Sequence, residues 1–196
     1  MNRKEEVINL AENFLLRKIE PNFNKLEKYL EENKELIVEN FSEKLNELFE
    51  LAIIQQKASI KEPIEYMYIS FLRSSMLVES YEFCIDLFNE MIWLDKEETT
   101  IYFPLKFIFQ YIDQDIEDMK SFVNRKIPQF NLDELKYQYS QCYIPFAALV
   151  INKIINEAIS KTNFYMLQIA ESFKVLFGGY MEKGEIIHII NRGAAV

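Results

Sequence analysis

The scarcity of glycine and proline limits most strongly what this chain can fold into. Its 196 residues include four glycines and five prolines, the residues that most often form turns between short elements. Few turn residues predict long elements, and long elements in a chain rich in Glu, Lys, Leu and Ile are predicted to be helices. We therefore expect an all-α fold, a helical bundle of about six to eight helices.

The length predicts a single domain over residues 1–196, because a chain of this size can bury one core without disulfides or a structural metal. Aromatic residues number 18 between positions 66 and 146 and 10 elsewhere, so the core is expected in the middle of the chain. We predict that N-terminal amphipathic helices over residues 3–57 pack on an aromatic-rich helical core over residues 63–177.

Two amphipathic helices are predicted in the N-terminal third. The first covers residues 3–20, and Pro21 is expected to end it. The second covers residues 23–56, with Lys and Glu opposite one apolar stripe. The stripe consists of Leu26, Leu30, Ile37, Phe41, Leu45, Leu48 and Ala52. We expect this helix to pack with one face in the bundle and also to form the interface of a homodimer.

Five further helices are predicted after Pro63. They cover residues 64–78, 81–94, about 100–124 with Pro104 in the first turn, 132–160 with Pro145 kinking or splitting it, and 162–177. Residues 180–191 differ, because a β-branched run at 186–190 favours a short strand or hairpin as much as a final helical turn. This C-terminal β element is the one departure that we allow from the all-α fold.

Charge and cysteine content exclude several classes of function. The net charge is −9, and no cluster of Lys and Arg exists that could bind a nucleic-acid backbone or an anionic membrane surface. The longest stretch without charge, residues 137–152, is too short for a membrane span and predicts a core helix. Cys84 and Cys142 lie in apolar runs, and the N-terminus does not resemble a signal peptide. We expect a cytoplasmic protein that binds neither nucleic acid nor membrane.

No metal or other cofactor is expected from the histidine content. Glu185 and His188 have the Glu-x-x-His spacing of ferritin-like di-iron sites, but such sites need two of these motifs and this chain has one histidine. A packed or surface imidazole is the favoured interpretation of His188. Catalysis by a Ser-His or Cys-His pair would depend wholly on the same side chain.

A group of four carboxylates could instead hold Mg²⁺. Asp113, Asp115, Glu117 and Asp118 form the densest acidic group of the chain, and paired carboxylates on helices can bind Mg²⁺ for phosphate chemistry. The group lacks adjacent aspartates and a second acidic helix facing it. A solvated helix face is therefore the favoured interpretation, and Asp113 is retained as a candidate binding residue.

Tyrosines and one arginine are the other candidate binding residues. Tyr66, Tyr111 and Tyr143 could line an aromatic pocket with polar tips, although a bulky core explains them as well. Arg73 lies in an apolar segment, so we predict that it is buried and paired with a carboxylate of another helix. Glu79, Asp86 and the acidic group at Asp113 are the expected partners.

The leading functional hypothesis is a non-enzymatic binding or regulatory module that acts on a protein partner or a small apolar ligand. It leads because residues for ordinary catalysis are scarce while surfaces suited to interaction are plentiful. The alternative hypothesis is a Mg²⁺-dependent helical enzyme with an aromatic pocket and an acidic helix around Asp113.

Overall fold

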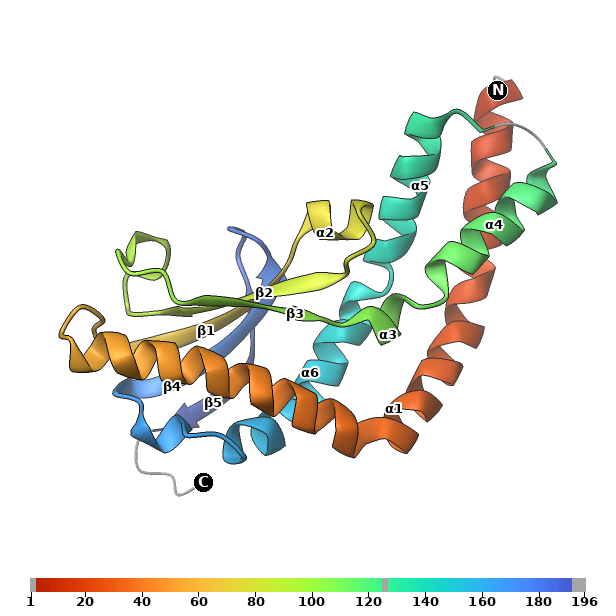
Figure 1. Ribbon diagram of the computed structural model, residues 1–196. Coiled ribbons are helices and arrows are strands. Elements are labelled where there is room, and N and C mark those ends of the chain that lie inside the picture. Colours follow the sequence, from red (N-terminus) through yellow and green to blue (C-terminus); the bar gives the residue numbers. More distant parts are fainter. Residues whose placement is uncertain (1–2, 125–126, 192–196) are drawn as a thin grey trace.

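The computed structural model, which describes residues 3–124 and 127–191, has a mixed α/β fold (Figure 1). It begins with one long helix, α1 (Arg3–Lys57). Four helices lie in the second half of the chain: α3 (Lys106–Phe109), α4 (Ile112–Val123), α5 (Gln129–Gln141) and α6 (Ile144–Ser160). The remaining helical pieces are short: α2 (Arg73–Leu77), η1 (Ile92–Leu94) and η2 (Phe164–Met166). The chain also forms five strands, so the prediction of an all-α fold, a bundle of six to eight helices, is wrong.

The five strands form one mixed sheet in the order β3-β2-β1-β4-β5. They are β1 (Ile64–Phe71), β2 (Glu82–Phe88), β3 (Thr100–Pro104), β4 (Ile169–Gly179) and β5 (Glu185–Asn191). The first three strands form an antiparallel meander. The chain then passes through α3–α6 and returns as β4, parallel to β1, followed by the antiparallel hairpin strand β5.

The central strands were mistaken for helices because both of their faces are covered. In β1, Met67 and Ile69 are buried on one face, and Tyr68 and Ser70 are buried on the other. A strand buried on both sides is a continuous apolar run, which hydrophobic periodicity does not distinguish from a buried helix. The same reason applies to β2, where the burial is equally continuous.

Two further predicted helices also contain strands. The segment predicted as a helix from about residue 100 starts with β3, which ends at Pro104 on the edge of the sheet, where proline is tolerated. Only α3 and α4 in this segment are helical. The helix predicted over 162–177 is replaced by η2 and β4, in which Phe173, Val175 and Phe177 alternate on the buried face. Of the two alternatives left open for residues 180–191, the structure has the strand, β5.

Pro21 does not end the first helix, because α1 continues through it over 55 residues. A proline removes one intrahelical hydrogen bond, and here tertiary packing on both sides of the proline favours the helix: Leu15 and Leu26 are both buried. The predicted apolar stripe of residues 23–56 is confirmed as a packed face, since its seven residues are at most 7% exposed. Leu30 and Phe41 thus lie in the core of a single chain, so this stripe is not available as a dimer interface. The homodimer itself stays a prediction.

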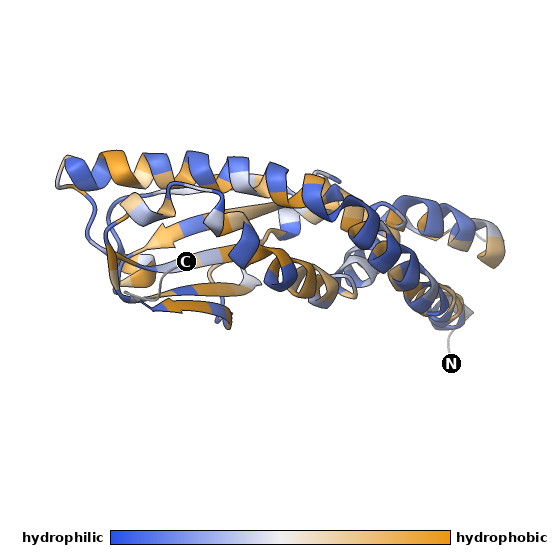
Figure 2. Ribbon diagram, turned by 90° about the horizontal axis from the view of Figure 1, so that it is seen from below, coloured by the Kyte–Doolittle hydropathy of each residue, from blue (hydrophilic) through white to orange (hydrophobic). Residues whose placement is uncertain are grey.

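The molecule has a sheet layer and a protruding helical arm. The C-terminal half of α1 and α6 pack together over one face of the sheet, where they share one core with residues such as Phe83 and Phe173 (Figure 2). The N-terminal half of α1 extends beyond the sheet and contacts α4 and α5 (Figure 1). We call these three helical segments the helical arm.

By length and composition alone, Gln129–Ser160 could cross a membrane. In the structure this segment is divided into α5 and α6 at Cys142 and Tyr143, close to the break predicted at Pro145. The inner face of α6 is buried in the protein core, with Val150, Ile154 and Ala158 fully enclosed. The prediction of a core helix in this segment is confirmed.

The centre of the second face of the sheet is covered by loops, and Tyr68 lies there. Its hydroxyl donates to the carbonyl oxygens of Gly179 and Glu182, 3.1 and 2.9 Å away, and its ring packs against Trp93. The β4–β5 hairpin passes so close to this ring that a Cβ on Gly184 would lie 2.7 Å from a ring carbon. Glycine is therefore required at position 184 for the hairpin to close over Tyr68.

Replacing this glycine should destabilise the fold. We expect Gly184→Ala to lower the free energy of unfolding by about 1–3 kcal/mol, because the Tyr68 ring is buried and cannot move aside. Gly179→Ala is the matched control, since its Cβ would meet only the end of the Glu182 side chain, and it should cost less than about 1 kcal/mol. Urea denaturation measures both values, and equal costs for the two variants would contradict the packing described for Tyr68.

Candidate functional site

A buried polar cluster holds the helical arm together. Asp115 of α4, Asn22 of α1, Tyr139 of α5 and Tyr143 before α6 are each at most 5% exposed. Asp115 Oδ2 accepts hydrogen bonds from Asn22 Nδ2 at 2.6 Å and from the Tyr139 hydroxyl at 2.7 Å. Asn22 Nδ2 also donates to the Tyr143 hydroxyl at 2.9 Å, and the two tyrosine hydroxyls are 3.0 Å apart. We call these four residues the arm cluster.

Burial fixes the protonation of the two tyrosines in the arm cluster. Burial raises the pKa of Tyr139 far above its ordinary value, and the hydrogen bonds to Tyr143 and Asp115 act in the same direction. Burial also raises the pKa of Tyr143. Lys18 Nζ lies 3.6 Å from Asp115 Oδ1 and places a positive charge at the edge of the cluster. Both tyrosines therefore remain protonated hydrogen-bond donors near neutral pH, and their hydroxyls tie the helices together.

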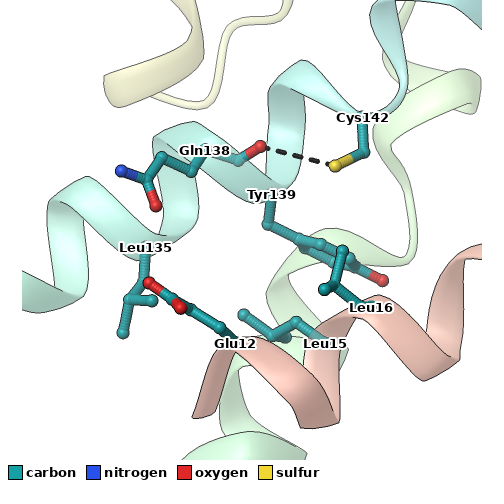
Figure 3. Close-up of a pocket in the computed structure, with 7 residues that line it drawn as sticks. All are labelled: Glu12, Leu15, Leu16, Leu135, Gln138, Tyr139 and Cys142. Atoms are coloured by element: carbon teal, nitrogen blue, oxygen red, sulfur yellow. Dashed lines mark hydrogen bonds between the residues drawn. The ribbon is translucent and has the colours of Figure 1, made fainter. Parts of the chain in front are cut away.

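An apolar pocket of about 260 Å³ lies beside this cluster, between α1 and α5 (Figure 3). Its lining residues are Glu12, Leu15 and Leu16 of α1, Leu135, Gln138 and Tyr139 of α5, and Cys142 in the turn that follows α5. Tyr139 belongs to both features, because its ring forms part of the pocket wall while its hydroxyl joins the arm cluster. We call this cavity the arm pocket.

The Cys142 thiol and the Tyr139 hydroxyl of the arm pocket both have hydrogen-bond partners within the protein. The Cys142 thiol donates to the carbonyl oxygen of Gln138 at 3.6 Å, and burial raises the pKa of this thiol. A protonated thiol is a weak nucleophile. The hydroxyl of Tyr139 is occupied by Asp115. The pocket is therefore suited to binding an apolar group.

The predicted acidic group does not converge on a metal site. Asp113 is bound to Lys136, Glu117 to Lys120, and Asp118 to Lys18, while Asp115 points into the arm cluster. Within residues 3–124 and 127–191, no group of three or more His, Cys, Asp or Glu side chains is arranged to hold a metal ion. The four carboxylates thus bind lysines or the arm cluster and do not converge on one point, although Asp115 and Asp118 both lie near Lys18.

Arg73 is not buried, contrary to the prediction. Its side chain is 62% exposed, because α2 follows the end of β1 at the surface and is not part of a central helix. The guanidinium lies 3.5 Å from Glu134 and 4.4 Å from the centre of the Tyr137 ring, so its carboxylate partner does come from another helix. That partner is not one of those expected. Arg73 connects α2 to α5 on the outside of the arm.

The other predicted site residues are spread over the molecule. Tyr66 lies on the second face of the sheet, and the ammonium group of Lys174 lies over its ring. Tyr111 directly precedes α4, and the ammonium group of Lys25 lies over its ring. His188 is paired with Val175 in the strand β5. Of the five predicted binding residues, Tyr143 is the one that contributes a hydrogen bond to the arm cluster. The single aromatic pocket expected from these tyrosines is not formed.

Cys84 is buried, as predicted, but it faces the second side of the sheet next to Asp86. Burial and the neighbouring carboxylate raise the pKa of its thiol to about 12. Asp86 is itself buried and accepts a hydrogen bond from Thr100, and burial raises its pKa. The carboxylate of Asp86 thus accepts hydrogen bonds from both the Cys84 thiol and the Thr100 hydroxyl.

The chain matches no known family. No curated protein and no solved structure matches it either. The functional argument therefore depends on the geometry of the arm pocket and the arm cluster.

None of the seven residues that line the arm pocket is among the five binding residues predicted from the sequence, and the sequence also held an unused signal for the arm cluster. The helices predicted over residues 3–20 and 23–56 leave Asn22 outside any helix. In a continuous helix it falls on the same face as Leu15 and Leu26, at spacings of seven and four residues. A polar residue within an apolar face indicates a buried hydrogen-bond partner.

Proposed function

We propose that the protein is a non-enzymatic binding module whose arm pocket holds a small apolar ligand. The observation that carries the proposal is an apolar cavity between two helices, walled by Leu15, Leu135 and the Tyr139 ring. Cavities between helices are common ligand sites. A bound ligand would contact α1 and α5 together, so it would stabilise the arm against unfolding.

The volume of the pocket limits the size of the ligand. At about 260 Å³, it is smaller than the roughly 300–1,000 Å³ of sites for drug-sized molecules. It is larger than a cavity of about 150 Å³ that suffices for benzene. The favoured ligands are therefore compounds of about one or two aromatic rings.

The competing hypotheses have less support. The Mg²⁺-dependent enzyme lacks converging carboxylates, since Asp113, Glu117 and Asp118 are each paired with a lysine.

For the localisation we keep the cytoplasm as a proposal, which the two free thiols Cys84 and Cys142 support.

Ligand binding should raise the melting temperature of the wild-type protein. At a concentration 100 times the dissociation constant, benzene, indole or naphthalene should stabilise the folded state by about 2.7 kcal/mol. Leu16→Trp should abolish the effect, because the larger ring occupies the pocket from its rim, where Leu16 is 55% exposed. Thermal melting of both proteins with each compound measures the effect.

Leu51→Trp is the matched control, since Leu51 is on the same helix, is similarly exposed and does not line the arm pocket. The control should respond to ligand like the wild type. Equal responses of all three proteins, or none in the wild type, would overturn the proposal. If no ligand binds, the alternative occupant of the arm pocket is a second copy of the chain. In that case light scattering would give twice the mass of 23.4 kDa, and Leu16→Glu would restore the monomer.

A further inference from the structure

The polar atoms at the mouth of the arm pocket are mainly acceptors. Glu12 contributes a carboxylate, which can only accept hydrogen bonds when ionised. Gln138 donates through Nε2 to Glu134 Oε1 at 2.9 Å, which leaves its own amide oxygen as an acceptor. The Cys142 thiol and the Tyr139 hydroxyl are directed to other partners. A ligand with donors would match this arrangement.

The charge at the pocket mouth is negative. Glu12 and Gln138 are the polar residues among the seven that line it, and no lysine or arginine is among them. Among the interactions of the described residues, no hydrogen bond or ion pair of Glu12 is found. Glu12 is half-buried. An unpaired carboxylate in such a position favours a cationic partner.

We propose that the ligand of the arm pocket is a small amphipathic cation, such as an arylalkyl ammonium. The inference rests on the proposed binding function and names the class of ligand. The aromatic body would pack against Leu15, Leu135 and the ring of Tyr139, and the ammonium group would bind the Glu12 carboxylate. A carboxylate ligand of the same shape would be repelled by Glu12.

Three compounds of similar shape and different charge test the inference: 2-phenylethylamine, 2-phenylethanol and 3-phenylpropionate. Isothermal titration at neutral pH and about 0.15 M salt gives the three dissociation constants. We expect the amine to bind about fivefold more tightly than the alcohol, which is near the upper limit for an ion pair at a half-exposed site. The propionate should bind more weakly than the alcohol.

Glu12→Gln should remove the preference for the amine and leave the affinity for the alcohol unchanged. Glu20→Gln, an exposed position on the same helix, is the matched control for the net charge of −9 and should keep the preference. If the amine and the alcohol bind equally well, the inference is wrong while the proposed function stands. An equal loss of preference in both variants also overturns it. If none of the three compounds binds, both proposals fail.

Discussion

Lys61→Met should lower the free energy of unfolding by about 3–5 kcal/mol, because it removes one partner of a fully buried ion pair. Lys61 and Asp95 have side chains that are 0% and 4% exposed, with Nζ and Oδ2 2.7 Å apart. The same ammonium group donates to the carbonyl oxygens of Leu87 and Glu97 at 2.8 and 2.6 Å. In the variant, the Asp95 carboxylate and the carbonyl oxygens of Leu87 and Glu97 lose this buried donor.

Urea denaturation of the variant measures this cost. Lys174→Met is the matched control, since the Lys174–Glu65 pair is partly exposed at 26% and 20%, and its loss should cost less than about 1 kcal/mol. If Lys61→Met yields no folded protein, the double variant Lys61→Met/Asp95→Asn should recover folding by removing the stranded charge. A cost below about 1 kcal/mol for Lys61→Met would show that the pair does not anchor the β2–β3 loop.

The same ion pair predicts a dependence of stability on pH. Burial raises the pKa of Asp95, but hydrogen bonds from Lys61 and from the backbone N–H groups of Asn89 and Glu97 outweigh it and lower the pKa below 3.8. A carboxyl whose pKa is lower in the folded state stabilises the fold above its unfolded pKa, and this contribution is lost as the pH falls through the folded pKa. The difference in stability between wild type and Asp95→Asn should be constant above about pH 5 and shrink below about pH 4.

Asp115→Ala should cost about 2–4 kcal/mol, the second large effect that we expect. The substitution leaves Asn22 Nδ2 and the Tyr139 hydroxyl without their acceptor inside the arm, and unsatisfied buried polar groups cost about 1–3 kcal/mol each. Asp113→Ala is a close control, because it changes the same residue type two positions earlier on α4. Asp113 is 55% exposed and binds Lys136 at the surface, so its loss should cost less than about 1 kcal/mol.

Thermal or urea unfolding of the two variants distinguishes the roles of the two aspartates. If both cost the same, Asp115 does not organise the arm. A combined variant, Asn22→Leu/Asp115→Leu, should be less destabilised than the sum of the single changes, because the two residues act on one hydrogen bond.

The sequence predicted well the elements with one exposed and one buried face. The stripe from Leu26 to Ala52 was correct because polar residues opposite it give a clear helical period. The helix predicted over residues 132–160 is present as α5 and α6, which begin three residues earlier at Gln129 and are divided at Cys142 and Tyr143 instead of at Pro145. The β-branched residues of 186–190 favoured a strand as much as a helical turn, and the structure has the strand β5.

The sheet was not predicted, because its inner strands have no polar face. Tyr68 is buried by loops that come from distant parts of the chain, around Trp93 and Gly184. Such burial depends on tertiary contacts, and local periodicity contains no information about them. The aromatic and β-branched content of residues 64–71 was the signal that favoured a strand.

The arm pocket was missed for a different reason. Its wall combines residues 12–16 with residues 135–142, and their proximity depends on α1 continuing through Pro21. Tyr143 was identified as a candidate because tyrosine hydroxyls need partners when buried. Its partner Asn22 was not identified, since a helix end was placed directly before it.

Methyl nuclear magnetic resonance of the protein with and without naphthalene tests most directly whether the arm pocket is the binding site. The methyl signals of Leu15, Leu16 and Leu135 should shift on addition of ligand, because their side chains line the cavity. The methyl signals of Ile186 and Ile189, which are exposed on the strand β5, should not move. Shifts at β5 with none at the three leucines, or no shifts at all, would contradict a ligand site in the helical arm.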